Sequence, residues 1–224
     1  MYIENLIEQQ KTQLVIFDLD GTLVDSVPEI AAAVDDALLA LNLPQAGVER
    51  VRDWVGNGLS KLWERALTHA GVYTPEFHQQ SYQDLLTHYE RNVNQSTCAY
   101  AGVTELLTVL QQHGITMAVC TNKMERFVPG ILQKQNIDSF FSMIVGGDTF
   151  AEKKPSALPL LEICQQLNVP VENTLMIGDS ESDAKAAHAA GIACVLLAQG
   201  YSQGIDLNTL PALALKTDIQ SLLM

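Results

Sequence analysis

Two carboxylates, Asp18 and Asp20, end an apolar run at residues 14–17 (LVIF) and are followed by a glycine and a threonine. The run predicts a short buried strand, in which side chains two positions apart point to the same face. Open α/β sheets hold their ligands where parallel strands end. Carboxylates about 4 Å apart repel each other by roughly 4 kcal/mol at an effective dielectric near 20. The pair therefore indicates a cation, a shared proton or a reaction here; the ordinary alternative is a strand ending in an Asp-Gly turn.

Residues 17–26 (FDLDGTLVDS) resemble the first motif, DxDGT, of the haloacid dehalogenase-like phosphohydrolases. In that family the first aspartate is a nucleophile and the second is a general acid/base. The resemblance implies these roles for Asp18 and Asp20. Because so short a motif also occurs by chance, the rest of the chain has to agree with it.

The length and composition narrow the class of protein. The 224 residues, 47% of them hydrophobic, suffice for one large domain, or for one medium and one small domain. The apolar runs are too short to cross a bilayer, and residues 1–5 lack a basic stretch followed by an apolar one. We therefore expect neither a membrane span nor a signal peptide.

The net charge and the cysteines narrow the class of protein further. The net charge of −13 disfavours nucleic acid and anionic membranes as partners, and it means that an anionic substrate needs cations of its own. The four cysteines are scattered, without a CxxC pair or a neighbouring histidine. This pattern predicts reduced thiols in a cytoplasmic protein and neither zinc nor disulfides.

The chain divides into a helical part and an α/β part. Apolar residues at helical spacing predict helices at 27–43, within 48–67 and at 75–91, and no strand-like run occurs in 27–95. From residue 101 helices and short apolar strands alternate. We expect helices at 102–113, 124–135, 156–167 and 181–190, and strands at 115–120, 141–145, 174–177 and 192–196. The stretch after residue 204 is weakly patterned.

This alternation predicts an α/β fold: a Rossmann-like parallel sheet with helices on both faces. The strand at 14–18 belongs to the sheet, yet the next strand comes about a hundred residues later. We therefore expect a small all-helical cap domain, residues 25–97, inserted after strand one of a core made of residues 1–24 and 98–224.

Polar residues also follow two later strands. Thr121 and Asn122 come after the strand at 115–120 and could donate hydrogen bonds to phosphate oxygens, although a helix cap is the ordinary role of such residues. Asp179 and Asp183 follow the strand at 174–177 and open a helix, where they could equally serve the helix dipole.

Lys153 and Lys154 precede Pro155, and a solvated surface pair is the ordinary reading. In a chain with 13 lysines and arginines against 26 acidic residues, a lysine near an anion site carries more weight. The proline restricts Lys154 to an extended backbone, which determines where its side chain starts.

Taken together, DxDGT, Thr, Lys-Pro and GDxxxD occur in the order of the four motifs of the phosphohydrolase family, each at a predicted strand end or in the loop that follows it. The resemblance covers essentially the whole chain. It implies that Asp18 forms an aspartyl-phosphate while Asp20 protonates the leaving alcohol and then deprotonates water. The remaining roles it implies are Mg²⁺ binding by Asp18, Asp179 and the carbonyl of Asp20, orientation of metal-bound water by Asp183, and phosphate binding by Thr121, Asn122 and Lys154.

The cap gives a hint about the substrate. Residues 50–58 (RVRDWVGNG) resemble a segment of the phosphoglycolate phosphatases that often reads WVGNG. Gly56 and Gly58 around Asn57 would let the backbone approach a small substrate, and Arg52, or Lys61 beyond it, could meet a substrate carboxylate. A solvated helix face is the ordinary role of both cations. The hinge at 98–102 (CAYAG) departs from the family in lacking a Pro-Gly pair.

In the family that the chain resembles, the dehalogenases lack the second aspartate, so the resemblance implies that a chain with Asp20 acts on oxygen-linked phosphate esters. The expected function is Mg²⁺-dependent hydrolysis of a small phosphate ester, 2-phosphoglycolate before a sugar phosphate such as N-acetylmuramate 6-phosphate or pyrophosphate. A phosphosugar mutase and a noncatalytic binding module are the more distant alternatives. The sequence is compatible with a monomer or a dimer.

Overall fold

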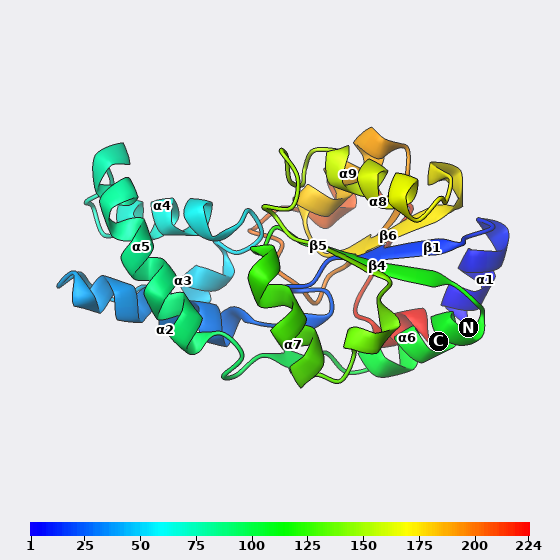
Figure 1. The fold of residues 1–224 in the computed structure, drawn as a ribbon, viewed down its shortest axis with the longest axis horizontal. Coiled ribbons are helices and arrows are strands. Elements are labelled where there is room, and N and C mark those ends of the chain that lie inside the picture. The colour runs from blue at the N-terminus through cyan, green and yellow to red at the C-terminus, as the bar shows by residue number, and fades with distance from the viewer.

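The computed structural model describes residues 1–224, and a six-stranded parallel sheet forms its larger part (Figure 1). The strands follow the order β5-β4-β1-β6-β7-β8. Their bounds are β1 Leu14–Phe17, β4 Thr116–Cys120, β5 Met143–Val145, β6 Thr174–Gly178, β7 Ala193–Leu197 and β8 Ala214–Lys216. Phe17 is in register with Val119 of β4 and Ile177 of β6, so the three central strands end at the same level.

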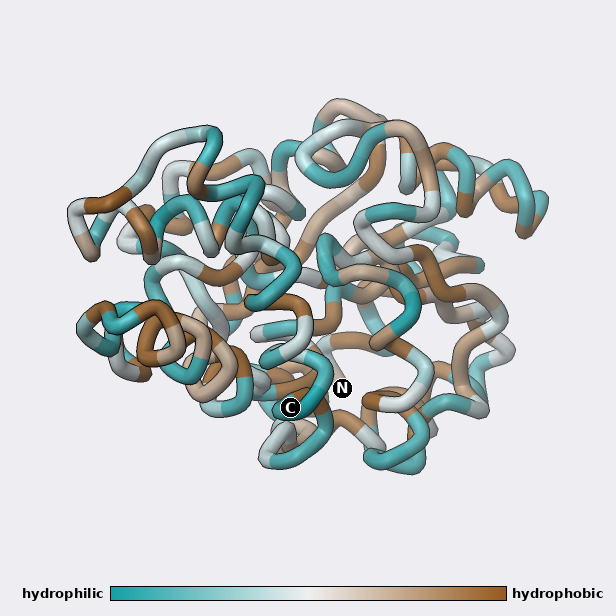
Figure 2. The backbone as a smooth tube through the Cα atoms, turned by 60° about the vertical axis from the view of Figure 1, so that its left-hand side comes forward, coloured by the Kyte–Doolittle hydropathy of each residue, from teal (hydrophilic) through white to brown (hydrophobic).

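Both faces of the sheet are apolar because both are covered by helices. Alternate residues of β1 enter different cores: Val15 and Phe17 join the core on one face, whereas Leu14 and Ile16 join the core on the other. The first core is covered by α1 (Tyr2–Gln9), α6 (Val103–Gln112) and α7 (Val128–Lys134), and the second by α8 (Leu158–Gln166) and α9 (Glu181–Ala190) (Figure 1). Figure 2 shows hydrophobic and hydrophilic residues alternating along the helices, as one buried face requires.

Four helices form a separate layer beyond one end of the sheet (Figure 1). They are α2 (Val27–Ala40), α3 (Val48–Arg52), α4 (Leu59–His69) and α5 (Pro75–Asn92). Their apolar faces enclose a core of their own around Trp63, and Phe127 and Tyr201 reach into it from the α/β part. The chain enters and leaves this layer through a two-stranded antiparallel pair, β2 (Val24–Asp25) and β3 (Cys98–Ala99). We therefore propose the division into a 25–97 cap and a 1–24 plus 98–224 core.

Several helix boundaries differ from the sequence expectation, and three of these differences have a local reason. The helix expected to reach residue 43 ends at Ala40, because Asn42 adopts a left-handed conformation with φ 58° and ends the regular backbone. The helix expected from 124 begins as a 3₁₀ turn at Glu125–Phe127 and becomes α-helical at Val128, where a proline starts α7. A proline in the first turn likewise starts α8 at Leu158, two residues later than expected.

The sequence analysis did not predict α1, the edge strand β8 or the short strands β2 and β3. The residues of β8 are all partly exposed, so this strand lacks the apolar run by which the inner strands are recognised. None of the helices combines the length and the apolar character of a membrane span. All four cysteines are free, three buried and one exposed.

Candidate active site

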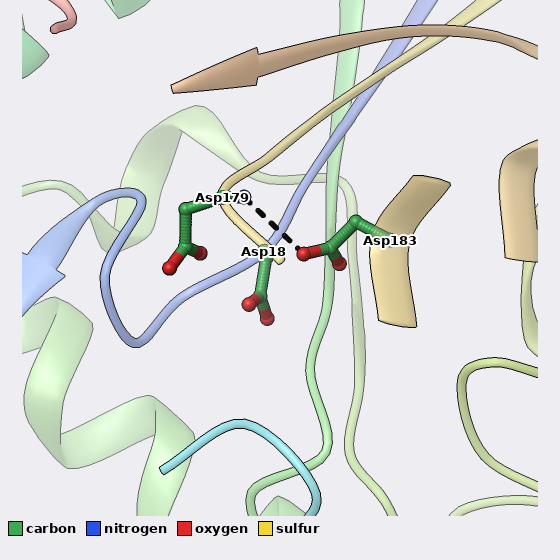
Figure 3. A group of neighbouring side chains, drawn as sticks. All are labelled: Asp18, Asp179 and Asp183. Carbon is green, nitrogen blue, oxygen red and sulfur yellow. Dashed lines mark hydrogen bonds between the residues drawn. The ribbon is translucent and has the colours of Figure 1, made fainter. Parts of the chain in front are cut away.

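The carboxyl ends of β1 and β6, which are adjacent parallel strands, bring three aspartates together. Carboxylate oxygens of Asp18, Asp179 and Asp183 lie within 4.8 Å of one another, and all three residues are buried (Figure 3). Asp18 directly follows β1, Asp179 directly follows β6, and Asp183 lies one turn into α9. Two strand ends and one helix start thus place a cluster of negative charge at one point.

Both carboxylate oxygens of Asp183 accept hydrogen bonds from other groups of the protein. Its Oδ2 accepts hydrogen bonds from the main-chain amides of Asp179 and Ser180, at 3.2 and 3.1 Å, and from the Ser180 hydroxyl at 2.6 Å. Its Oδ1 accepts from Lys154 Nζ at 2.6 Å. With four donors around it, this carboxylate anchors the loop after β6 and orients the lysine.

Lys154 is the cation of this cluster, and its side chain is only 2% exposed. Its Nζ lies 2.9 Å from Asp18 Oδ1 as well as 2.6 Å from Asp183 Oδ1. Burial alone lowers the pKa of an ammonium, but the Asp18 and Asp183 carboxylates outweigh burial and raise the pKa of Lys154. The lysine is therefore charged, and it bridges the expected nucleophile and its neighbour.

One lysine does not balance three buried carboxylates. Burial raises the pKa of Asp18 to about 7, with Lys154 opposing the rise and Asp183 adding to it. Burial and the adjacent carboxylates of Asp18 and Asp183 raise the pKa of Asp179 well above its usual range. The cluster thus lacks positive charge, which a divalent cation would supply.

The donors suit Mg²⁺, a hard ion that prefers oxygen ligands. Asp18 Oδ1 is buried and ion-paired with Lys154 but accepts no hydrogen bond, so this oxygen has a position free for a ligand. The Asp179 carboxylate accepts hydrogen bonds from the Thr22 hydroxyl at 2.8 Å and from the Tyr201 main-chain amide at 2.6 Å. Asp18, Asp179 and the carbonyl of Asp20 could hold the ion.

The Asp179 carboxylate is seated between two glycines. A Cβ at Gly200 would lie 2.1 Å from Asp179 Oδ2, and one at Gly21 would lie 2.3 Å from the same oxygen. Gly21 also has φ +91°, a backbone conformation that L side chains rarely adopt. Gly200 belongs to no motif, and its role emerges only from this contact.

Asp20 does not belong to this cluster and pairs with a lysine that the sequence analysis did not single out. Lys123 Nζ lies 2.9 and 3.1 Å from the two Asp20 oxygens, and Ser26 Oγ donates to Asp20 Oδ1 at 2.5 Å. The Lys123 side chain is 4% exposed, and its ammonium lies 5.3 Å from the centre of the Tyr89 ring of α5. Burial alone would lower the pKa of Lys123, but Asp20 and Tyr89 outweigh burial and raise it.

Thr121 and Asn122 directly follow β4 and line the same cavity as Asp18, the expected nucleophile. The Thr121 side chain accepts a hydrogen bond from the Lys123 amide at 3.2 Å. The Asn122 amide nitrogen donates to the carbonyls of Gly56 and Lys154, both at 2.9 Å. In this conformation Asn122 therefore links the cap to the loop of Lys154, a contact that the sequence did not predict.

A cavity lies between the sheet end and the cap, and half of its lining residues are hydrophobic. The core contributes Asp18, Asp20, Thr121 and Asn122, all expected site residues, together with Lys123. The cap contributes a largely apolar wall that includes both glycines of the 54–58 loop. The lining consists of Asp18, Asp20, Ile30, Val55, Gly56, Gly58, Leu59, Leu62, Tyr89, Thr121, Asn122, Lys123, Met124 and Phe127.

The cap loop is fastened to the core around Asn57. Its carbonyl accepts from Lys153 Nζ at 2.9 Å, and its side-chain nitrogen donates to Ser182 Oγ at 3.3 Å. Arg65 holds the loop from the cap side, donating to Asn57 Oδ1 at 2.7 Å and to Gln203 Oε1 at 3.2 Å. Arg65 and Gln203 thus join cap and core, although neither belongs to a recognisable motif.

The two cap cations expected near a substrate lie outside the cavity lining. Arg52 has its guanidinium 3.9 Å from Asp25 Oδ2 and 5.5 Å from the centre of the Tyr201 ring. Lys61 is largely exposed and pairs with Glu64 at 2.6 Å. Of the five cap residues singled out from the sequence, Gly56 and Gly58 line the cavity, whereas Asn57, Arg52 and Lys61 do not.

Known proteins resemble this chain in both sequence and architecture. The profile of the haloacid dehalogenase-like hydrolases matches residues 15–197. A phosphoglycolate phosphatase of Pseudomonas savastanoi pv. phaseolicola is 45% identical over 205 residues, which cover 90% of this chain and 75% of that protein. A phosphoglycolate phosphatase of Colwellia psychrerythraea is 41% identical over 203 residues, covering 89% of this chain and 90% of that protein.

A solved structure is also similar to this chain in fold and sequence. The crystal structure of a predicted phosphoglycolate phosphatase from Haemophilus somnus superposes with a TM-score of 0.90 at 34% identity, covering 95% of this chain and 97% of that one. The protein is accordingly an enzyme, a phosphoric monoester hydrolase. The matched motifs, the parallel sheet and the extent of the matches all agree that this chain belongs to the haloacid dehalogenase-like hydrolase family.

Proposed function

We propose that this enzyme hydrolyses 2-phosphoglycolate to glycolate and inorganic phosphate, with Mg²⁺ as cofactor and a phosphorylated Asp18 as intermediate. The observation that carries the reaction type is the placement of Asp18 beside Lys154 while Asp20 faces the cavity. The substrate is supported by the phosphoglycolate phosphatases that the chain resembles and by a cavity over which the cap is fastened.

In the first half-reaction a carboxylate oxygen of Asp18 attacks phosphorus, and the bond between phosphorus and the ester oxygen breaks. Asp20, in its acid form, gives its proton to the departing alkoxide of glycolate. In this proposal Lys154, which lies beside Asp18, balances the charge of the phosphoryl group, and Thr121, which lines the cavity, orients that group.

In the second half-reaction Asp20 takes a proton from water, and the resulting hydroxide attacks the phosphorus of the aspartyl-phosphate. The bond from phosphorus to the Asp18 oxygen breaks, which releases inorganic phosphate and restores the carboxylate. Mg²⁺ held by Asp18, Asp179 and the Asp20 carbonyl would neutralise phosphoryl charge that Lys154 alone does not balance. Asp183 keeps Lys154 in place throughout.

The experiment is a panel of phosphate esters ranked by kcat/KM. It contains 2-phosphoglycolate, N-acetylmuramate 6-phosphate, pyrophosphate, glucose 1-phosphate and an aryl phosphate. We expect 2-phosphoglycolate to rank first and glucose 1-phosphate to give no glucose 6-phosphate. A sugar phosphate or pyrophosphate in first place would contradict the proposed substrate while leaving the reaction type intact.

A further inference from the structure

Lys123 is the only lysine or arginine among the fourteen residues that line the cavity. Seven of the others are hydrophobic, and the charged ones are Asp18 and Asp20, both negative. A substrate carboxylate that enters this space therefore meets apolar side chains, two acids and one ammonium. An anion without a partner is strongly disfavoured in such surroundings.

The other cations near the site are engaged elsewhere. Lys154 is committed to Asp18 and Asp183 on the phosphoryl side. Lys153 donates to the Asn57 carbonyl, and Arg52 lies against Asp25 and the Tyr201 ring. None of these three residues belongs to the cavity lining.

Lys123 also lies on the correct side of the reaction. Its ammonium is 2.9 and 3.1 Å from the oxygens of Asp20, the proposed acid for the leaving group. Asp20 has to approach the ester oxygen in order to protonate it, and in 2-phosphoglycolate the carboxylate is separated from that oxygen by one carbon. A cation in contact with Asp20 is therefore within reach of the leaving group's carboxylate.

We propose that Lys123 is the specificity-determining residue that binds the carboxylate of the substrate's leaving group; the inference rests on the proposed function. An ammonium has three N–H donors, so Lys123 can keep a hydrogen bond to Asp20 while it donates another to the substrate. The Tyr89 ring, 5.3 Å away on α5, stabilises the cation from the cap side. Selection of an acidic leaving group thus depends on a core lysine that a cap residue holds in place.

The test compares two esters of similar size, 2-phosphoglycolate and 2-hydroxyethyl phosphate, which lacks the carboxylate. Both have alkoxide leaving groups that need Asp20, so any disturbance of Asp20 affects both and cancels in the ratio of their kcat/KM values. We expect Lys123→Met to reduce the preference for 2-phosphoglycolate by about 10- to 100-fold. Lys123→Arg should retain a larger part of the preference because it keeps the charge.

Arg52→Met is the matched control, because it removes a cation that lies outside the lining, and it should leave the ratio within about twofold of the parent. If Lys123→Met does not fold, the same comparison is made with Lys123→Arg and the inhibitors 3-phosphonopropionate and propylphosphonate, which differ in the carboxylate. There we expect the arginine to shift only the inhibition constant of 3-phosphonopropionate, and equal shifts for both inhibitors would overturn the inference.

The outcomes separate the two proposals. A parent enzyme without a preference for 2-phosphoglycolate contradicts both the proposed function and the role of Lys123. A parent with the preference, together with a Lys123→Met variant that retains it, overturns the inference alone. Equal losses on both esters would show that Lys123 only positions Asp20, and a ratio that falls in Arg52→Met instead would assign the carboxylate to the cap.

Discussion

The main-chain amide of Tyr201 donates a 2.6 Å hydrogen bond to the carboxylate of Asp179, an expected metal ligand. The phenol of the same residue lies at the hinge, where it donates to Asp25 Oδ1 at 2.6 Å and accepts from the Ser26 amide at 3.0 Å. One buried residue thus contacts the acidic cluster through its backbone and the start of the cap through its side chain.

Removing the Tyr201 hydroxyl should separate these two contacts. Tyr201→Phe leaves the hydrogen bond from its main-chain amide to Asp179 but removes one hydrogen-bond donor to Asp25 and the acceptor of the Ser26 amide. We expect a loss of about 1–3 kcal/mol in the free energy of unfolding, measured in urea, and a Mg²⁺ affinity within about threefold of the parent. Tyr100→Phe is the control, because the Tyr100 hydroxyl is buried without a hydrogen-bond partner. Equal destabilisation by both changes would contradict the role of the hinge bonds.

The nucleophile can be tested by an almost isosteric change. Asp18→Asn should reduce kcat by more than about a thousandfold, because an amide oxygen cannot form the acyl phosphate. The melting temperature should remain near that of the parent, since Lys154 retains its bond to Asp183. Residual turnover above about a thousandth of the parent value would indicate direct transfer of the phosphoryl group to water.

The metal prediction has a readout that does not depend on activity. Chelation with EDTA should abolish turnover and Mg²⁺ should restore it, whereas Ca²⁺ should inhibit because its looser coordination misplaces Asp18. In the absence of substrate, Mg²⁺ should also raise the melting temperature, because it binds only the folded cluster of carboxylates. Asp179→Asn should eliminate most of that rise. Full activity in chelator would contradict the metal site.

The cap offers a matched pair of glycines, one inside the 54–58 loop and one outside it. Gly47 and Gly58 both precede helices with nearly the same backbone, φ 80° and ψ 160° against φ 85° and ψ 164°. A Cβ on Gly58 would lie 2.8 Å from Lys153 Nζ and 3.1 Å from the Asn122 carbonyl oxygen, whereas a Cβ on Gly47 would meet nothing within 4 Å. The two substitutions by alanine share the backbone strain and differ in the contact with the core.

Gly58→Ala should therefore raise KM for 2-phosphoglycolate about tenfold or more and change KM little for an aryl phosphate hydrolysed with the cap open. Gly47→Ala should cost about 1 kcal/mol of stability without affecting either KM. Steady-state kinetics on the two substrates provide the measurement. Equal losses of both substrates in Gly58→Ala would mean that the loop supports catalysis in general and not specificity.

The sequence by itself was sufficient for the family and the α/β fold, because both are encoded locally. Buried parallel strands are short apolar runs such as 14–17, and the site residues expected from the core motifs follow such runs or precede a proline. Since parallel strands end at one edge of the sheet, the order of those motifs along the chain already implied that Asp18, Thr121 and Asp179 meet. The helical cap was equally visible, as a long segment of helical periodicity without strands.

Only the tertiary structure decided which charges pair and which residues face the cavity. A lysine after a strand reads as a surface residue, and nothing in positions 121–123 indicates that Lys123 is buried against Asp20 and Tyr89. The sequence offered Arg52 as a possible partner of a substrate carboxylate, yet its side chain lies against Asp25 and Tyr201. Such pairings join residues that are far apart in the chain, and burial and charge balance choose the partner only once the chain has folded.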